Sequence, residues 1–221
     1  ASPGVTNSGF IAQGFKPILL ENYPLKKFIK KNNISSRKKN SLIYHGNIAP
    51  ERGISELIKA LSLVNKKLPD VFLSIYGEFR TTSYKEKISK LVSSLGLDNH
   101  IAFNPHIKHE NIWEYLRENL IGVIPFNDNS LTRINTPTKL FEYMAAGCHI
   151  LSSSLPPVIR YDARINFFPP GDVRLLASSI VTIFNNIVED DILYNYEKVE
   201  STYHWEKNKK KIKETYYKIY K

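Results

Sequence analysis

The sequence contains a single cysteine, Cys148, so no disulfide bond can form within the chain. It has no run of about 18 apolar residues and no basic stretch followed by an apolar one near its start, so it predicts neither a membrane-spanning helix nor a signal peptide. It also lacks an Asp-x-Asp pair, a common site for a divalent cation. We therefore expect a protein of a reducing compartment, the cytoplasm, that needs no metal ion and no other cofactor.

What the sequence does contain is an ordinary globular composition, with 42% hydrophobic and 24% charged residues. That composition excludes a chain that is disordered throughout. A length of 221 residues allows one large domain or two small ones.

Positive charge is concentrated in two segments of the chain. The formal net charge is +10, to which residues 26–40 contribute +7 and residues 206–221 contribute +5, leaving −2 for the remainder. Such segments fit solvated surfaces, and they also fit an anionic membrane, at about 1 kcal/mol per lysine near the surface, or nucleic acid. We favour solvated surfaces, keep peripheral contact with the inner face of a membrane as an alternative, and expect no nucleic-acid partner.

The first 40 residues do not read as the start of an independent fold. Residues 1–14 are small and polar and lack an initiator methionine. Residues 16–25 contain Pro-Ile-Leu-Leu followed by Glu-Asn-Tyr-Pro, which predicts a short buried strand stopped by a proline. We interpret residues 1–40 as the end of an N-terminal domain and a basic linker, and the chain as a piece of a longer protein.

From residue 41 onward, short apolar runs alternate with stretches of helical periodicity. Strands are predicted at residues 42–45, 71–76, 101–104, 121–126, 149–153 and 166–168, and helices at residues 52–67, 83–94, 110–118, 137–146 and 173–187. Strands that are apolar throughout and alternate with helices predict the α/β class, with a parallel sheet covered on both faces. We therefore predict a Rossmann-like domain over residues 41–187, whose ligand lies beyond the carboxyl ends of the strands.

C-terminal helices are expected in residues 188–221. The apolar residues Trp205, Ile212, Tyr216, Ile219 and Tyr220 fall on one stripe, which predicts a basic amphipathic helix. We favour a helix that packs on the protein over a membrane anchor.

The segment from Asn135 to Gly147 has the most unusual chemistry. Thr136 is a good N-cap, Pro137 fits the first helical position, and Gly147 is typical of a left-handed helix end. The helical period places two sets of residues on opposite sides: the apolar Leu140, Phe141 and Met144, and the more polar Thr138, Lys139, Glu142 and Ala146.

The polar side of this predicted helix combines a cation with a carboxylate. Free N–H groups near Thr138 and Lys139 form an anion site, and the Lys139 ammonium adds a full charge to it. Glu142 lies one turn further along, where a phosphate would repel it, so it should accept hydrogen bonds from hydroxyl groups. A diphosphate followed by a ribose supplies these groups in this order. The alternative is a Lys–Glu surface pair, worth about 0.2 to 0.5 kcal/mol.

Three loops after predicted strands supply further candidates. Arg52 lies near a helix start, where the dipole disfavours a cation by about 0.3 to 1 kcal/mol unless an anion binds; the alternative is an arginine offset by Glu51. The other two loops contain Gly77 and Glu78, where a ligand can approach closely, and His106 and Ile107, where backbone groups can meet a planar base. The alternative for His106 is an exposed loop histidine.

Four motifs, taken in order, resemble one family. They are Tyr44-His45-Gly46-Asn47, Glu51-Arg52-Gly53, Ser74-Ile75-Tyr76-Gly77 and the segment from Pro137 to Gly147. Together they are similar to the C-terminal half of GT-B glycosyltransferases of the family 4 type. The resemblance implies a Rossmann-like domain that binds a nucleotide-sugar donor, with a separate N-terminal domain that binds the acceptor across a cleft.

The resemblance also implies roles for the matched residues. Arg52 and Lys139 would contact the diphosphate as the catalytic residues, and Glu142 would be the second glutamate of the E-x7-E motif, which holds the ribose. The first glutamate falls at Ile134, which cannot bind a sugar hydroxyl, and Asn47 departs from the usual Gly-Arg of the first loop. The other substrate-binding candidates are Gly46, Asn47, Gly53, Gly77, Glu78, His106, Ile107, Thr138 and Leu140.

We interpret the chain as the donor-binding domain of a retaining, metal-independent glycosyltransferase. It would transfer a sugar from a nucleoside-diphosphate sugar to a glycan or lipid-linked acceptor, and we expect it to be inactive without its acceptor domain. Two alternatives stay open: a nucleotide-sugar epimerase of similar architecture, and a non-catalytic module held to its partner by the basic segments.

Overall fold

The computed structural model describes residues 14, 18–30 and 36–219. Six parallel strands form one sheet in the order β3-β2-β1-β4-β5-β6. The strands are β1 (Ser41–His45), β2 (Phe72–Tyr76), β3 (Ile101–Asn104), β4 (Ile121–Ile124), β5 (His149–Ser153) and β6 (Asn166–Phe168). This is the strand order of a Rossmann fold, so the predicted α/β class is confirmed.

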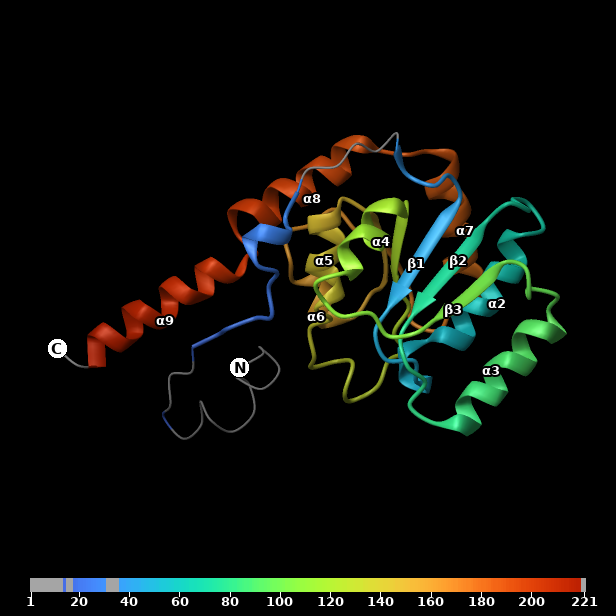
Figure 1. Cartoon of the computed structure of the whole chain (residues 1–221), viewed down its shortest axis with the longest axis horizontal. Helices are drawn as coiled ribbons and strands as arrows, with labels where there is room; N and C mark the ends of the chain where they lie inside the picture. Colours follow the sequence, from blue (N-terminus) through green and yellow to red (C-terminus); the bar gives the residue numbers. More distant parts are fainter. Residues whose placement is uncertain (1–13, 15–17, 31–35, 220–221) are drawn as a thin grey trace.

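Helices cover both faces of the sheet (Figure 1). On one side lie α2 (Ile54–Val64), α3 (Thr82–Ser94) and α7 (Val173–Asn185), and on the other α4 (Ile112–Glu118), α5 (Lys139–Ala146) and α8 (Glu189–Ser201). The remaining helical elements are η1 (Lys26–Phe28), η3 (Pro50–Arg52), α6 (Pro156–Ile159) and α9 (Trp205–Ile219). No helix among the described residues combines the length and apolarity needed to cross a membrane.

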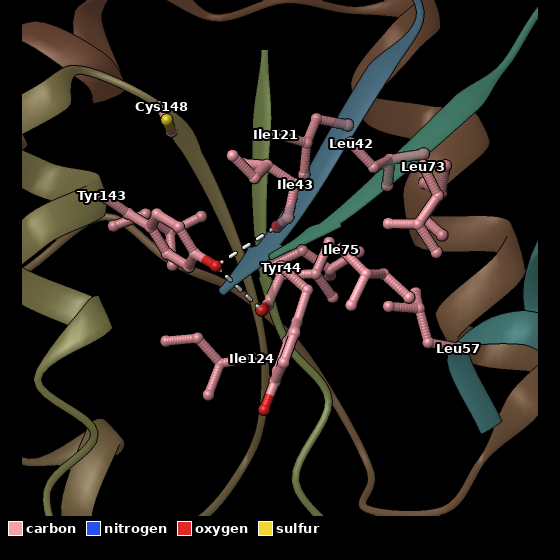
Figure 2. Packing of buried hydrophobic residues seen from close by; sticks show 14 of the residues in the cluster. Leu42, Ile43, Tyr44, Leu57, Leu73, Ile75, Ile121, Ile124, Tyr143 and Cys148 are labelled. Carbon is pink, nitrogen blue, oxygen red and sulfur yellow. Dashed lines mark hydrogen bonds between the residues drawn. The ribbon is translucent and has the colours of Figure 1, made fainter. Parts of the chain in front are cut away.

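Tyr143 ties α5 to the sheet at the point where the strand order reverses (Figure 2). Its hydroxyl lies 3.2 Å from the carbonyl oxygen of Ile43 in β1 and 3.4 Å from that of Val123 in β4. Its ring fills the space beside Gly122, where a Cβ would come within 2.4 Å of the ring. The helix is therefore fixed over β1 and β4, between which the ligand crevice of such a sheet opens.

The helix α5 begins two residues later than the sequence predicts. It starts at Lys139, and Thr138 occupies the N-cap position without a side-chain cap, so the prediction of Thr136 as N-cap is wrong. All eight of its residues are buried, because α4 and α8 pack against it as well as the sheet. Lys139 and Glu142 are each only 6% exposed, which rules out a surface Lys–Glu pair.

Arg37 closes the C-terminal end of α5. Its guanidinium is buried and donates hydrogen bonds of 2.5 Å to the carbonyl oxygens of Ala146 and Asn119. Gly147 adopts the predicted left-handed conformation, with φ 71°. One residue of the basic segment 26–40 therefore has a structural role, whereas its neighbour Lys38 forms an exposed ion pair with Glu118 at 2.6 Å.

The strand predicted at residues 16–25 does not form over the described residues 18–25. Ile18 and Leu19 are exposed, and no strand of the sheet pairs with the described part of this segment. Without a neighbouring strand to hydrogen-bond with, the apolar run does not form a strand. Residues 16 and 17 lie outside the described part of the chain. The segment is held by side chains instead: Tyr23 contacts Phe141 of α5 with ring centroids 4.7 Å apart, and Phe28 stacks on Trp113 of α4 at 5.0 Å.

The C-terminal helices differ from the expected packing. The helix α8 packs against α5 although its composition is polar. In contrast, α9 projects away from the body of the protein (Figure 1). Its start is anchored by the N–H of Trp205 on the carbonyl oxygen of Pro24 at 2.8 Å and by buried Asn208, while Ile212 and Tyr216 are exposed. Tyr220, the last residue of the predicted stripe, lies outside the described residues.

Candidate functional site

Two adjoining pockets open where the loops after β1 and β4 meet the start of α5. The larger has a volume of about 470 Å³ and the smaller about 220 Å³. Gly46, Thr138 and Lys139 line both of them, so the two pockets share a boundary at the N-terminus of α5. This is the edge of the sheet where the strand order predicts a ligand.

Lys139 is a buried ammonium between aromatic rings. Its Nζ lies 3.8 Å from the ring centroid of Tyr44 and 5.0 Å from that of Phe126. Within the described part of the chain, no carboxylate lies at ion-pair distance from it. Burial lowers the pKa of Lys139 well below its usual value and the charge of Arg52 lowers it further, with only Glu142 opposing. An anion in the larger pocket would supply the missing counter-charge.

Arg52 lies beside Lys139 in the wall of the larger pocket. Its guanidinium packs over the ring of Phe126, 4.6 Å from the centroid. The nearest carboxylate, Glu51, is 4.0 Å from Arg52 and forms a closer ion pair with Arg80. Because Arg80 already neutralises Glu51, the structure favours an arginine available to a ligand over one offset by Glu51.

The backbone adds donors to these two cations. The N–H groups of Thr138 and Lys139 make no backbone hydrogen bond among the described residues, and the first N–H of the helix that does is that of Leu140, on Pro137. Gly46 leaves the space in front of Lys139 open to a ligand, because a Cβ at position 46 would lie 3.2 Å from Lys139 Nζ. Gly46 also has a φ of 111°, which residues other than glycine rarely adopt. The arrangement is an anion site made of two charges and a helix start.

Glu142 lies in the smaller pocket between two histidines. His109 Nε2 is within hydrogen-bond distance of Oε1 at 2.9 Å, and His45 Nε2 lies 3.0 Å from Oε2. Although burial raises the pKa of Glu142, the two histidines together outweigh it and lower the pKa to about 2. The carboxylate is therefore charged and fixed in place by one histidine at each oxygen, and each oxygen keeps a lone pair that can accept a further hydrogen bond.

The smaller pocket extends from Glu142 towards the loop after β3. His106 and Ile107 of that loop line it as predicted, together with Tyr76 at the end of β2. His106 is an exposed residue and Ile107 a half-buried one. This end of the pocket therefore offers an apolar and aromatic surface of the kind that holds a planar ring.

The structure places four of the predicted residues outside both pockets. Gly53 is buried under the loop after β4, where a Cβ would lie 1.6 Å from the carbonyl oxygen of Pro125, and Leu140 is a core residue of α5. Gly77 and Glu78 line a separate hollow with a volume of about 360 Å³. The remaining candidates, Gly46, Asn47, Arg52, His106, Ile107, Thr138, Lys139 and Glu142, all line at least one of the two pockets.

Sequence reasoning missed the two histidines that hold Glu142. His45 is the last residue of β1 and directly precedes Gly46. Its position at the carboxyl end of a predicted strand could have marked it as a candidate site residue. His109 lies in the loop between β3 and α4, and the sequence gives no sign of its contact with a residue 33 positions later. Across residues 14, 18–30 and 36–219, no group of three or more His, Cys, Asp or Glu side chains is arranged to hold a metal ion.

Comparisons with known proteins agree with this geometry. YqgM of Bacillus subtilis (strain 168), described as an uncharacterized glycosyltransferase, is 28% identical over 90 residues, which cover 41% of this chain and 24% of that protein. The structure of HepE from Anabaena in complex with UDP-glucose aligns with a TM-score of 0.79 at 17% identity and covers 95% of this chain and 60% of that one. The chain thus spans less than two thirds of either relative.

A third similarity comes from a protein of comparable length. The C-terminal domain of LpcC, a glycosyl transferase group 1 family protein from Francisella tularensis, aligns with a TM-score of 0.66 at 21% identity and covers 81% of this chain and 98% of that one. At these identities the solved structures share the fold. The family model described as Glycosyl transferases group 1 matches residues 26–191, which is most of the sequence, and this chain therefore belongs to the group 1 glycosyl transferases.

Proposed function

We propose that this chain binds the nucleotide-sugar donor of a retaining, metal-independent glycosyltransferase of the family 4 type. One observation carries the proposal: the first turn of α5 presents two charged groups to adjoining pockets. One is a buried ammonium that has no carboxylate at ion-pair distance among the described residues, and the other is a buried carboxylate that two histidines hold in place. A nucleoside diphosphate supplies both complements, first the diphosphate and then the ribose hydroxyls.

The diphosphate lies against Lys139, Arg52 and the N–H groups at the start of α5. When the bond between the sugar and the diphosphate breaks, negative charge increases on the leaving oxygen. The two side-chain cations and the helix start stabilise that charge in a site with few competing waters, as preorganised donors do in other transferases. Burial lowers the pKa of Lys139, whereas a bound diphosphate raises it. The diphosphate therefore keeps Lys139 protonated.

The ribose lies against Glu142 in the smaller pocket. His45 and His109 fix the carboxylate, and each of its oxygens keeps a lone pair that a ribose hydroxyl can use. The base then extends towards Tyr76, His106 and Ile107. HepE has been solved with UDP-glucose, which makes a uridine nucleotide the first probe to use.

The acceptor, a glycan or lipid-linked saccharide, binds through a further domain. We therefore expect the 221 residues alone to show no turnover, and turnover of a nucleotide-sugar with added acceptor by this chain would contradict the proposal. The protein works in the cytoplasm.

Contact with the inner face of a membrane is a separate proposal that rests on α9. Its exposed surface carries Ile212, Tyr216 and Tyr217 among lysines. The chain should then co-sediment with vesicles that contain phosphatidylserine and not with neutral vesicles, and Tyr216→Ser should weaken this binding. Sedimentation with neither kind of vesicle, or equal sedimentation with both, would contradict it.

Donor binding is tested by thermal unfolding with UDP, GDP, ADP and CMP. A ligand at 100 times its dissociation constant stabilises the fold by about 2.7 kcal/mol, and each kcal/mol corresponds to roughly 2 to 4 °C for a chain of this size. We expect one nucleotide to raise the melting temperature of the wild type, and Glu142→Ala to reduce that rise. Glu118→Ala is the matched control, because it removes an exposed carboxylate whose ion-pair partner among the described residues is Lys38. If no nucleotide shifts the wild type, the proposal loses its support.

A further inference from the structure

The larger pocket has one wall that comes from the segment before the sheet. Leu20, Glu21 and Asn22 line it, and Glu21 is the only acidic side chain among its described lining residues. Glu21 is 5% exposed, so this carboxylate is held at the pocket and does not move freely in solvent.

Side chains on three elements hold Glu21 in place. Its Oε1 accepts hydrogen bonds from Arg160 Nη2 at 2.5 Å and from Thr136 Oγ1 at 3.3 Å. Its backbone carbonyl oxygen accepts a hydrogen bond from Asn208 Nδ2 at 2.6 Å. The next aromatic residue, Tyr23, packs against Phe141 of α5. The carboxylate is therefore positioned before any ligand arrives.

One oxygen of this carboxylate has no hydrogen-bond partner among the described residues. Both contacts to the side chain use Oε1, and no hydrogen bond to Oε2 is formed by the described residues. Thr136 and Asn135 line the pocket near this group and bring further polar atoms. A carboxylate oxygen in a pocket wall is suited to a hydrogen-bond donor on the ligand.

The charges of the pocket limit what that donor can be. Lys139 and Arg52 take the anionic part of the ligand. Arg160 neutralises Glu21, so charge alone does not decide what binds beside it; however, a carboxylate oxygen can only accept hydrogen bonds, and the oxygens of a diphosphate cannot donate them. The group at Glu21 should therefore donate hydrogen bonds, fit in the same pocket as the diphosphate, and be attached to it. The sugar of the donor meets all three conditions.

We propose that Glu21 binds a hydroxyl group of the donor sugar and helps to determine which sugar the site accepts. The inference rests on the proposed function. It also accounts for Ile134, the position at which the family resemblance places a sugar-binding glutamate. Ile134 is 42% exposed and lies outside both pockets, so the carboxylate at the sugar comes from a different part of the chain.

The test compares two ligands that differ only by the sugar. The affinities of UDP and UDP-glucose, or of the nucleotide pair that stabilises the wild type most, are measured by calorimetry for the wild type, Glu21→Ala and Glu21→Gln. We expect Glu21→Ala to weaken binding of the nucleotide-sugar by about tenfold to a hundredfold, the usual effect of losing a hydrogen bond to a charged group, and to leave the nucleoside diphosphate within about twofold. Glu21→Gln keeps the shape of the side chain and should show a smaller loss, and it serves as the test if the alanine variant does not fold.

Arg160→Met is the matched control for a purely structural role, because it removes the ion pair and keeps the carboxylate. If Glu21 only anchors its segment, the glutamate and arginine variants will behave alike, and the ratio of the two ligand affinities will stay at the wild-type value in both. That result would overturn the role of Glu21 while leaving nucleotide binding intact. A wild type that binds neither ligand would instead overturn the proposed function and this inference with it.

Discussion

The two ends of α5 are built in opposite ways. At the C-terminal end, Gly147 and Cys148 donate to the carbonyl oxygens of Met144 and Tyr143 in a Schellman motif, and Arg37 satisfies Ala146. At the N-terminal end, the first N–H groups have no backbone acceptor in the described structure, and the ammonium of Lys139 faces only aromatic rings. Both ends are buried, so the difference is not one of exposure to water. The helix leaves polar groups without partners only where it borders a pocket.

The largest test of this comparison removes the charge at the open end. Lys139→Met should weaken nucleoside diphosphate binding by about a hundredfold to a thousandfold, the effect of losing one preorganised donor to an oxyanion. The same change should raise the free energy of unfolding without ligand by about 1 to 4 kcal/mol, the range seen when buried charged groups are replaced by apolar ones. Calorimetry and chemical denaturation measure the two effects. A variant that loses both stability and binding would mean that Lys139 is part of the fold's support and not held for a ligand.

The second test removes the partner at the closed end. Arg37→Met leaves two buried carbonyl groups unsatisfied, at about 1 to 3 kcal/mol each, so the free energy of unfolding should fall by about 2 to 6 kcal/mol. Nucleotide affinity should stay within about twofold, because no atom of Arg37 reaches either pocket. Lys38→Met, which breaks only an exposed ion pair, should cost less than about 1 kcal/mol. A change in nucleotide affinity for Arg37→Met equal to its change in stability would contradict a separation of the two ends.

The third test uses pH on the contact between His109 and Glu142 in the smaller pocket. A hydrogen bond to Glu142 raises the pKa of His109 above 6.5, against the opposing effect of burial. The folded state then binds the proton more tightly than the unfolded state, so this contribution to stability is complete below about pH 6.5 and is lost as the pH rises through the raised value. The melting temperature of the wild type should exceed that of His109→Asn at low pH, and the difference should shrink with rising pH.

The contributions of His109 and Glu142 to stability change in different pH ranges and can therefore be measured separately. Since the pKa of Glu142 in the folded protein is about 2, below the usual glutamate value of 4.5, the stability due to Glu142 is present above about pH 4.5 and is lost as the pH falls towards 2. Measurements between about pH 5 and 9 therefore report on His109 alone in this pair. A difference between wild type and His109→Asn that is constant over this range would show that the contact contributes no charge-dependent stability.

The smallest test concerns the missing cap at the open end. Thr138 forms no side-chain hydrogen bond to the helix, so Thr138→Ala should change the free energy of unfolding by less than about 0.5 kcal/mol. In α7 the carboxylate of Asp172 accepts a hydrogen bond from the N–H of Leu175 at 2.9 Å, so Asp172→Ala should cost about 1 kcal/mol. Thermal unfolding of the two variants compares a helix start left open for a ligand with one closed by its own side chain.

Most of the sheet and its order of elements could be predicted from the sequence. All six strands were found because each is a short apolar run next to a helical pattern, and Gly147 marked the end of α5 correctly. The strand expected within residues 16–25 was wrong because an apolar run becomes a strand only if a neighbouring strand can pair with it. The polar helix α8 was not predicted as an element of its own, because its packing on α5 depends on only a few buried positions.

The chemistry of the site was predictable only in part. The positions of Lys139 and Glu142 on one helix turn follow from their spacing, and the structure brings both to the two pockets. Their burial does not follow from spacing, since it is produced by α4 and α8 from distant parts of the chain. The contacts of His45 and His109 with Glu142, and of Arg160 with Glu21, join residues 33 to 139 positions apart and therefore need the tertiary fold.

The contact between Tyr143 and Gly122 has a consequence for how this family member can change over time. A Cβ at position 122 would lie 2.4 Å from the ring of Tyr143, which α5 packs against β4. Position 122 must therefore stay glycine while an aromatic side chain occupies position 143. The two positions must therefore be inherited as a pair, and a change at one can persist only after a compensating change at the other. The residues of α5 that line the two pockets are not bound by this restriction, so the pocket lining can diverge while the attachment of the helix to the sheet stays constant.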